Sequence, residues 1–129
     1  MLAPQYIKYV EKSRVSADKD LLDSIYNALT TAASDPDIDT DTIIDTAGSN
    51  IGFSTLSPTG AADDFSSVVL DTLGQGLNGN AASVEGKLKS KIADSNDIQI
   101  SVDSNGNYTV FLGTSINDAS GITVGAGAN

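Results

Sequence analysis

The N-terminal part of the chain carries its longest regular pattern of hydrophobic and polar positions. Residues 2–33 contain no glycine and no proline after Pro4, so this segment is predicted to be one helix. Residues three and four positions apart form one row on its surface. The early part of this row is charged (Glu11, Arg14 and Asp18), and the later part is apolar (Leu21, Leu22, Ile25, Ala28, Leu29 and Ala32).

One hydrophobic core cannot lie under both parts of this row. A helix of this length spans about 45 Å, which exceeds the width expected of one small domain. We therefore expect a single domain, 1–129, in which residues 1–20 project from a head formed by residues 21–129. The projecting half carries the apolar residues Tyr6, Ile7, Tyr9 and Val10. Such exposed apolar surface favours contact with a partner, and a helix end frayed in solution is the competing interpretation.

The clearest strand pattern lies near the C-terminus. Residues 98–102 alternate between apolar and polar positions, and residues 108–112 follow after a Ser-Asn-Gly-Asn sequence. The pair Asn105-Gly106 suits a two-residue hairpin turn, because both residues tolerate positive φ. The apolar face of this hairpin is predicted to pack on Leu21, Ile25 and Leu29, and residues 122–124 to add an edge strand.

Shorter elements are predicted between the helix and the hairpin. Residues 61–77 fit a helix capped by Ser57 or Thr59 and ended by Gly74 and Gly76. Residues 83–92 fit a short helix with a Glu85 to Lys89 pair, in preference to a strand. Residues 43–59 are expected to be irregular. The whole pattern predicts an α+β fold, with the long N-terminal helix packed on a small C-terminal antiparallel sheet.

Composition excludes several kinds of chemistry. The chain has no cysteine and no histidine, which excludes disulfides, thiolate zinc sites and thiol catalysis and removes the commonest general base. It also lacks a phosphate-binding glycine loop and a nucleophile elbow, so we expect neither an enzyme nor a cofactor. The net charge of −10 repels phosphate backbones, so nucleic-acid binding by the acidic head is not expected.

A run of alternating aspartates follows the predicted helix and suggests a calcium site. The candidate ligands are Asp35, Asp37, Asp39 and Asp41. In the EF-hand pattern, however, Thr40 replaces the required glycine and Thr46 replaces the bidentate glutamate. A solvated turn, in which aspartate side chains bind their own backbone, is the competing interpretation, and we predict no useful calcium affinity.

The segment from Pro4 to Arg14, PQYIKYVEKSR, resembles type IV pilins and pseudopilins just after their membrane-embedding stretch. In that family a proline, an aromatic pair and mixed charges recur there, preceded by a leader peptide and an apolar run. Met1 directly before Leu-Ala-Pro indicates an introduced start on a truncated form. The absence of a disulfide is more like the Gram-positive members.

The resemblance implies a pilin-like fold and a structural subunit of a type IV pilus on the bacterial surface. Its partners are then further copies in a helical filament, the assembly machinery of the cytoplasmic membrane, and a host-cell or polymer surface. The native precursor, with a methylated N-terminus, is expected in the cytoplasmic membrane before assembly. The expected subunit contacts are Tyr6, Ile7, Tyr9, Val10, Glu11, Arg14 and Asp18. A pseudopilin of a secretion or DNA-uptake system and a surface adhesin are the alternatives.

Overall fold

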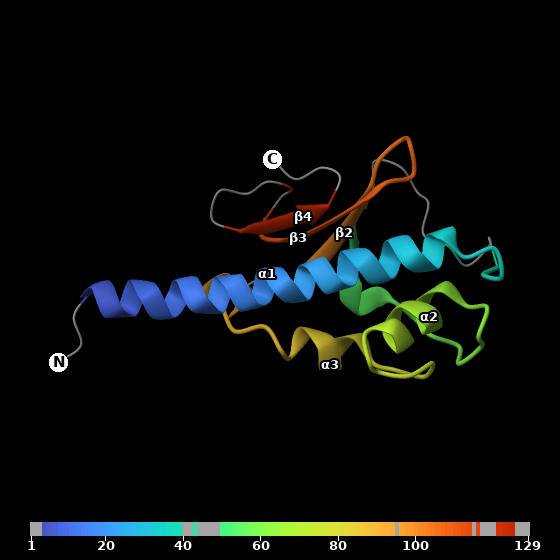
Figure 1. Ribbon diagram of the computed structural model, residues 1–129, viewed down its shortest axis with the longest axis horizontal. Helices are drawn as coiled ribbons and strands as arrows, with labels where there is room; N and C mark the ends of the chain where they lie inside the picture. Colours follow the sequence, from blue (N-terminus) through green and yellow to red (C-terminus); the bar gives the residue numbers. More distant parts are fainter. Residues whose placement is uncertain are drawn as a thin grey trace.

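The computed structural model describes residues 4–39, 43, 50–94, 96–114, 116 and 121–125 of the chain, with the side chains of the first helix described from Val10 onward. A long helix comes first and a sheet is completed last (Figure 1). The helices are α1 (Pro4–Ser34), η2 (Phe53–Thr55), α2 (Phe65–Thr72), α3 (Ala81–Glu85) and η3 (Lys91–Asp94). The strands are β1 (Asn50–Gly52), β2 (Ile98–Val102), β3 (Tyr108–Leu112) and β4 (Ile122–Gly125).

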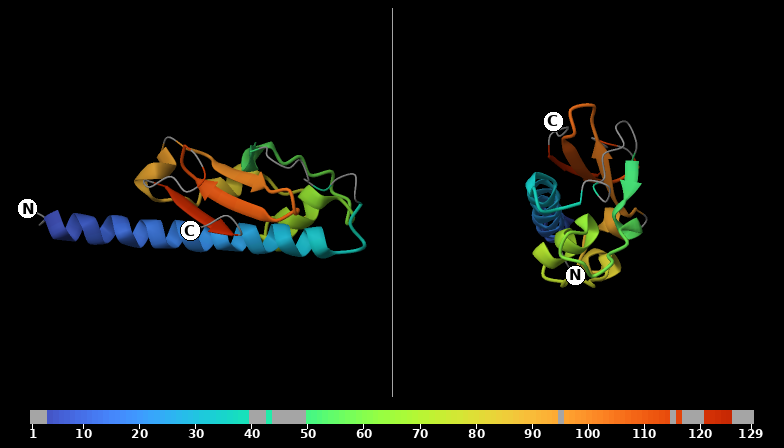
Figure 2. Two further views of the ribbon diagram at one scale, coloured as in Figure 1. Left: turned by 90° about the horizontal axis from the view of Figure 1, so that it is seen from above. Right: turned by 90° about the vertical axis from the view of Figure 1, so that its right-hand side faces the viewer.

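The sheet has the order β1-β2-β3-β4, and every neighbouring pair is antiparallel. Helix α1 packs against the sheet at strands β3 and β4. It also contacts helix α2. In the view along the long axis of the molecule, α1, the sheet and the short helices are arranged around a common interior (Figure 2). The predicted α+β arrangement of a long N-terminal helix on a C-terminal antiparallel sheet is confirmed at this level.

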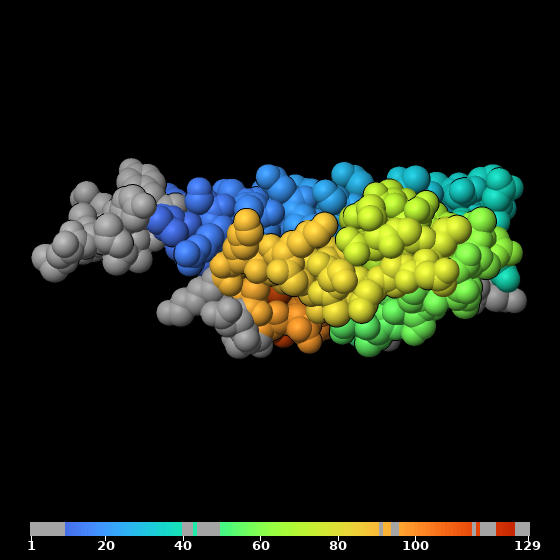
Figure 3. All heavy atoms as spheres, turned by 90° about the horizontal axis from the view of Figure 1, so that it is seen from below, coloured from blue at the N-terminus to red at the C-terminus, as the bar shows by residue number. Residues whose placement is uncertain are grey.

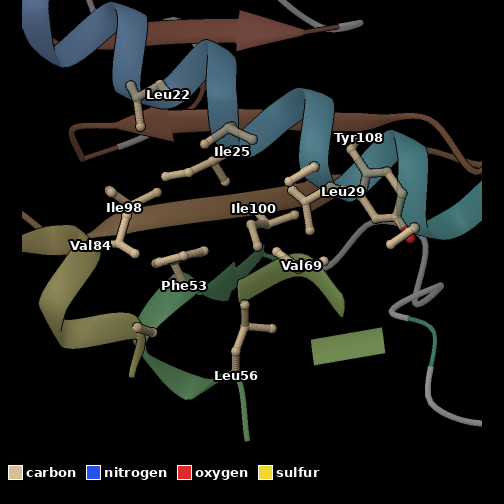
Figure 4. Close-up of a cluster of buried hydrophobic side chains, with 14 of the residues drawn as sticks. Leu22, Ile25, Leu29, Phe53, Leu56, Val69, Val84, Ile98, Ile100 and Tyr108 are labelled. Carbon is tan, nitrogen blue, oxygen red and sulfur yellow. The ribbon is translucent and has the colours of Figure 1, made fainter. Parts of the chain in front are cut away.

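The core lies where the apolar row of α1 meets the hairpin. Leu22, Ile25 and Leu29 are fully buried and face Ile98 and Ile100 of β2 (Figure 4). Phe53, Leu56, Val69 and Val84 close the core from the other side. Leu22 takes the place predicted for Leu21, which packs at the edge and is only partly buried. The alternating burial of β2 is what the sequence pattern predicted.

The hairpin is confirmed, but its turn has a different centre from the predicted one. Gly106 N–H donates to the carbonyl of Asp103, so Ser104 and Asn105 occupy the two central positions. The Asp103 side chain accepts from the N–H groups of Asn105 and Asn107, each at 2.9 Å. Gly106 follows with φ of +81°, a conformation that glycine adopts without a steric penalty. Asp103 therefore organises the turn, and Asn105-Gly106 is not its central pair.

Three other predictions are corrected within the connecting region. Helix α2 forms, but it begins at Phe65 and is capped by Asp64, not by Ser57 or Thr59. Helix α3 covers Ala81–Glu85 with Gly86 as its C-cap, and turns continue to Leu88, so only the first part of the helix predicted over residues 83–92 is formed and it does not reach Lys89. Residues 50–52, expected to be irregular, form the short strand β1 on β2.

Helix α1 extends beyond the head at its N-terminal end (Figure 1). The boundary predicted after residue 20 is too late in the chain, because Val15 already packs against the core and Asp18 is buried. The helix from Val15 to Asp20, about one and a half turns, thus belongs to the head. Between Pro4 and Arg14 the helix backbone continues outward from it.

Candidate assembly surface on the first helix

The residues predicted to make subunit contacts occupy the outer half of α1. The side chains of Tyr6, Ile7 and Tyr9 lie outside the described residues, although their backbone is helical. Val10 and Glu11 are half-buried, whereas Arg14 is exposed. The part of α1 that begins at Val10 is drawn in blue toward one end of the molecule in Figure 3. The structure thus keeps Arg14 on an accessible helix face close to the head.

Asp18 differs from the other predicted contact residues because its carboxylate is bound within the head. Its side chain is only 1% exposed. Oδ1 accepts from the Lys89 N–H at 2.9 Å, and Oδ2 accepts from the N–H groups of Lys89 at 3.2 Å and Ser90 at 2.8 Å. The expectation that Asp18 belongs to a projecting assembly surface is therefore wrong: it joins α1 to the segment after α3.

Asp18 is buried because it binds the backbone of the segment after α3, at Lys89 and Ser90. The helix-like backbone hydrogen bonds that follow α3 end with the bond from the Leu88 N–H to the Glu85 carbonyl, so the N–H groups of residues 89 and 90 need other acceptors. A buried carboxylate that accepts several N–H groups satisfies them and is itself stabilised. Sequence reasoning missed this contact because the two partners are 71 and 72 positions apart. The break at Gly86 was the available signal.

A shallow hollow lies beside the point where α1 leaves the head. It has a volume of about 530 Å³, and the described residues that line it are Glu11, Lys12, Val15 and Ser16 of α1. These positions form one face of the helix, because they are one turn apart in pairs. Val15 gives this face an apolar centre and Lys12 an exposed charge, a combination suited to another polypeptide surface.

The aspartate run forms a hydrogen-bonded turn after α1. Asp35 Oδ1 accepts from the Asp37 N–H at 2.9 Å, and the Asp39 N–H donates to the carbonyl of Asp63 at 2.9 Å. Asp41, the fourth candidate ligand, lies outside the described residues. Within the described part of the chain, no three acidic side chains gather in a geometry that holds a metal ion. The weak affinity for calcium remains a prediction.

Two further carboxylates lie inside the head. Asp64 Oδ2 accepts from Ser67 N–H at 3.0 Å, Ser67 Oγ at 2.8 Å and Thr59 N–H at 3.2 Å, so it ties a loop to the start of α2. Glu85 Oε1 is buried without a hydrogen-bond partner. Burial raises the pKa of the Glu85 carboxyl, nearby Asp97 raises this pKa further, and the Ile98 N–H partly offsets the rise. Asp64 thus stabilises the fold, whereas the charged form of Glu85 is disfavoured by its burial.

Comparison with protein-family models, curated proteins and solved structures found no match to this chain. Among the residues that the structure describes, no helix combines the length and the apolar content required to cross a bilayer. The function of the protein is therefore inferred from the geometry and the sequence of α1.

Proposed function

We propose that this protein is the structural subunit of a type IV pilus filament and that the outer half of α1 is its assembly surface. The observation that supports the proposal best is the continuous helix Pro4–Ser34, in which Val15 is the first residue, among those whose side chains the structure describes, that packs against the core of the head. A helix that continues outward from its own domain gains little stability from propensity alone. Packing against neighbouring subunits supplies a reason for its length.

The chemistry of the outer half agrees with this role. Its sequence has apolar residues interleaved with Lys8, Lys12 and Arg14, and the hollow beside Val15 offers a surface for a neighbouring helix. Charged side chains between packed helices fix register and partner more than they add affinity. A bundle of copies would thus bury the apolar residues and pair the charges.

The remaining parts of the proposal follow from the resemblance at Pro4 to Arg14. The head has the long helix and antiparallel sheet expected of a pilin-like fold, and we assign it to that fold. The filament is placed on the bacterial surface, where adhesion to a host cell or polymer would use the head. The precursor is placed in the cytoplasmic membrane with the assembly machinery.

Electron microscopy of the producing cells tests this function. Antibodies raised against residues 1–129 are expected to decorate surface filaments along their whole length, and deletion of the gene is expected to remove the filaments. Decoration confined to the cell envelope, with no filament on the surface, would support the pseudopilin alternative instead. Labelling of the surface without any filament, at gene copy numbers that give strong expression, would contradict both.

A further inference from the structure

A second pocket lies between the last turns of α1 and the hairpin that joins β2 to β3, and we call it the hairpin pocket. Its volume is about 210 Å³. Both segments lie toward the end of the molecule opposite the outer half of α1 (Figure 1). The polar and aromatic residues that line it are Tyr26, Thr30 and Ser34 of α1 and Asn107 and Tyr108 of the hairpin. The assembly surface on α1 does not include this pocket.

The helical wall of the hairpin pocket is one face of α1. Tyr26, Thr30, Ala33 and Ser34 are spaced by three or four positions and therefore lie in one row. Ser34 Oγ donates to the Thr30 carbonyl at 2.8 Å, which leaves the lone pairs of this hydroxyl as acceptors. The Tyr26 ring lies against Gly125, where a Cβ would be 2.8 Å from it. Packing and a hydrogen bond thus hold this wall in place.

The opposite wall is the end of the hairpin turn. The Asn107 N–H donates to Asp103 Oδ1 at 2.9 Å, and the Asn107 carbonyl accepts from the Asp103 N–H at 3.0 Å. These bonds fix the backbone of Asn107, whereas the residue itself is exposed. The space beside Gly106 is open, because a Cβ there would meet no atom within 4 Å. A ligand therefore meets walls that are already ordered, which lowers the entropic cost of binding.

The lining of the pocket selects against charged and apolar ligands. Among the described residues that line it, none carries a charge, so it offers neither a carboxylate to a cation nor a basic group to an anion. The net charge of −10 also repels anions. An apolar ligand would leave the hydroxyl and amide groups without hydrogen-bond partners. The lining therefore suits a neutral ligand that both donates and accepts hydrogen bonds.

The size of the pocket narrows the class further. Its volume of about 210 Å³ is below the range of about 300–1,000 Å³ that is typical of sites for drug-sized ligands. A single sugar ring is a small neutral ligand with several hydroxyl groups and with faces of C–H groups. Hydroxyl and amide side chains donate to and accept from such hydroxyl groups, and an aromatic side chain covers a C–H face.

We propose that the hairpin pocket binds one ring of a neutral saccharide. The ring exchanges hydrogen bonds with Thr30, Ser34 and Asn107, and one of its C–H faces packs on Tyr26. The inference deepens the adhesive part of the proposed function, on which its biological setting rests, by naming the chemical class of the surface ligand. It also assigns adhesion to a part of the head that the assembly surface leaves accessible.

Titration of the isotope-labelled protein with methyl glycosides, followed by NMR, tests the site. The neutral probes are the methyl glycosides of glucose, galactose, mannose and N-acetylglucosamine. Methyl glucuronide is the anionic control and choline the cationic control. At least one neutral glycoside should bind saturably and shift the signals of the Asn107 side-chain amide and the Thr30 N–H. Because this ligand is uncharged, its dissociation constant should be the same at about 0.05 M and about 0.5 M salt.

Matched variants locate the binding site. Thr30→Val and Asn107→Ala each remove a hydrogen-bonding group from the pocket and should weaken binding about threefold or more. Thr31→Val and Asn105→Ala make the same changes at positions that do not line the pocket, and both should bind as the unchanged protein does. All four residues are exposed, so the variants should keep the fold, which their NMR spectra show directly.

Absence of saturable binding by every neutral glycoside would overturn the proposal. So would an equal loss of affinity in the pocket variants and the control variants, or binding of choline or methyl glucuronide without binding of any neutral glycoside. Binding is measured on the protein in solution, so its outcome is independent of whether cells carry filaments. Filament labelling decides the proposed function.

Discussion

At the scale of single residues, Asp18 shows how one carboxylate decides where a helix joins its head. In the sequence it continues the charged row of Glu11 and Arg14, and spacing alone gives all three the same role. In the structure its two oxygens accept from backbone N–H groups of Lys89 and Ser90. The role of a charged residue in such a row therefore depends on a distant segment, which periodicity does not reveal.

Removal of the Asp18 carboxylate should destabilise the head. In the Asp18→Ala variant the buried N–H groups of residues 89 and 90 lose their acceptor, which costs about 2–4 kcal/mol of unfolding free energy. The Asp20→Ala change, at an exposed neighbour, should stay within about 0.5 kcal/mol. Urea unfolding followed by circular dichroism measures both. Equal midpoints for the two variants would contradict the assigned role of Asp18.

Glu85 should make stability depend on pH. Its pKa is raised by burial first and by Asp97 second, so the folded state holds the proton more tightly than the unfolded state. The stabilising effect of protonation is fully present below the ordinary glutamate pKa of about 4.3 and is lost as pH rises through the raised pKa. Glu85→Gln, which removes the charge, should therefore raise the melting temperature at pH 7 more than at pH 4.

The matched variant Asp97→Asn removes only the second cause of the Glu85 shift. Asp97 is exposed, so this change should give a smaller gain at pH 7, in the same direction. Scanning calorimetry of both variants at the two pH values is the measurement. A gain from Glu85→Gln that is as large at pH 4 as at pH 7 would show that charge burial is not its cause.

At the scale of elements, the sequence predicted the helices and strands in which apolar and polar residues alternate regularly over several positions. The alternation over residues 98–102 and the apolar row from Leu22 to Leu29 fix β2 and the inner face of α1, because a one-residue shift would expose the whole set. Strand β1 has three residues, too few for a pattern, and exists because β2 offers an unpaired edge. The cap at Asp64, which accepts from the Ser67 N–H three residues ahead, and the end of α3 at Gly86 are local features, so the sequence did carry a signal for both.

The contact between α1 and β4 depends on one glycine. Gly125 has φ of +109°, and a Cβ there would lie 2.7 Å from the Tyr108 carbonyl oxygen and 2.8 Å from the Tyr26 ring. Gly125→Ala should therefore cost more than the roughly 1–2 kcal/mol of a left-handed backbone. Gly74→Ala is the matched control, since Gly74 has φ of +85° with open space around it. Similar unfolding free energies for the two variants would contradict close packing at Gly125.

At the scale of the whole molecule, one part of the candidate site could be predicted from the sequence and another part could not. The outward extension of α1 followed from length and periodicity, and the structure places Arg14 on an exposed face of it. The contact of residues 89 and 90 with α1 did not follow from the sequence, because it requires a segment 71 and 72 positions away to return to Asp18. No local pattern encodes such long-range hydrogen bonds.

The central claim is that the outer half of α1 serves assembly and the inner half serves the head. Arg14→Ala in the full-length protein tests it most directly, with Arg14→Lys as the control that keeps the charge. The head should keep its unfolding free energy within about 0.5 kcal/mol, because Arg14 is exposed, while counts of surface filaments should fall severalfold and recover partly with lysine. Unfolding of the head by Arg14→Ala, or filament counts equal to those of the unchanged protein, would contradict the account.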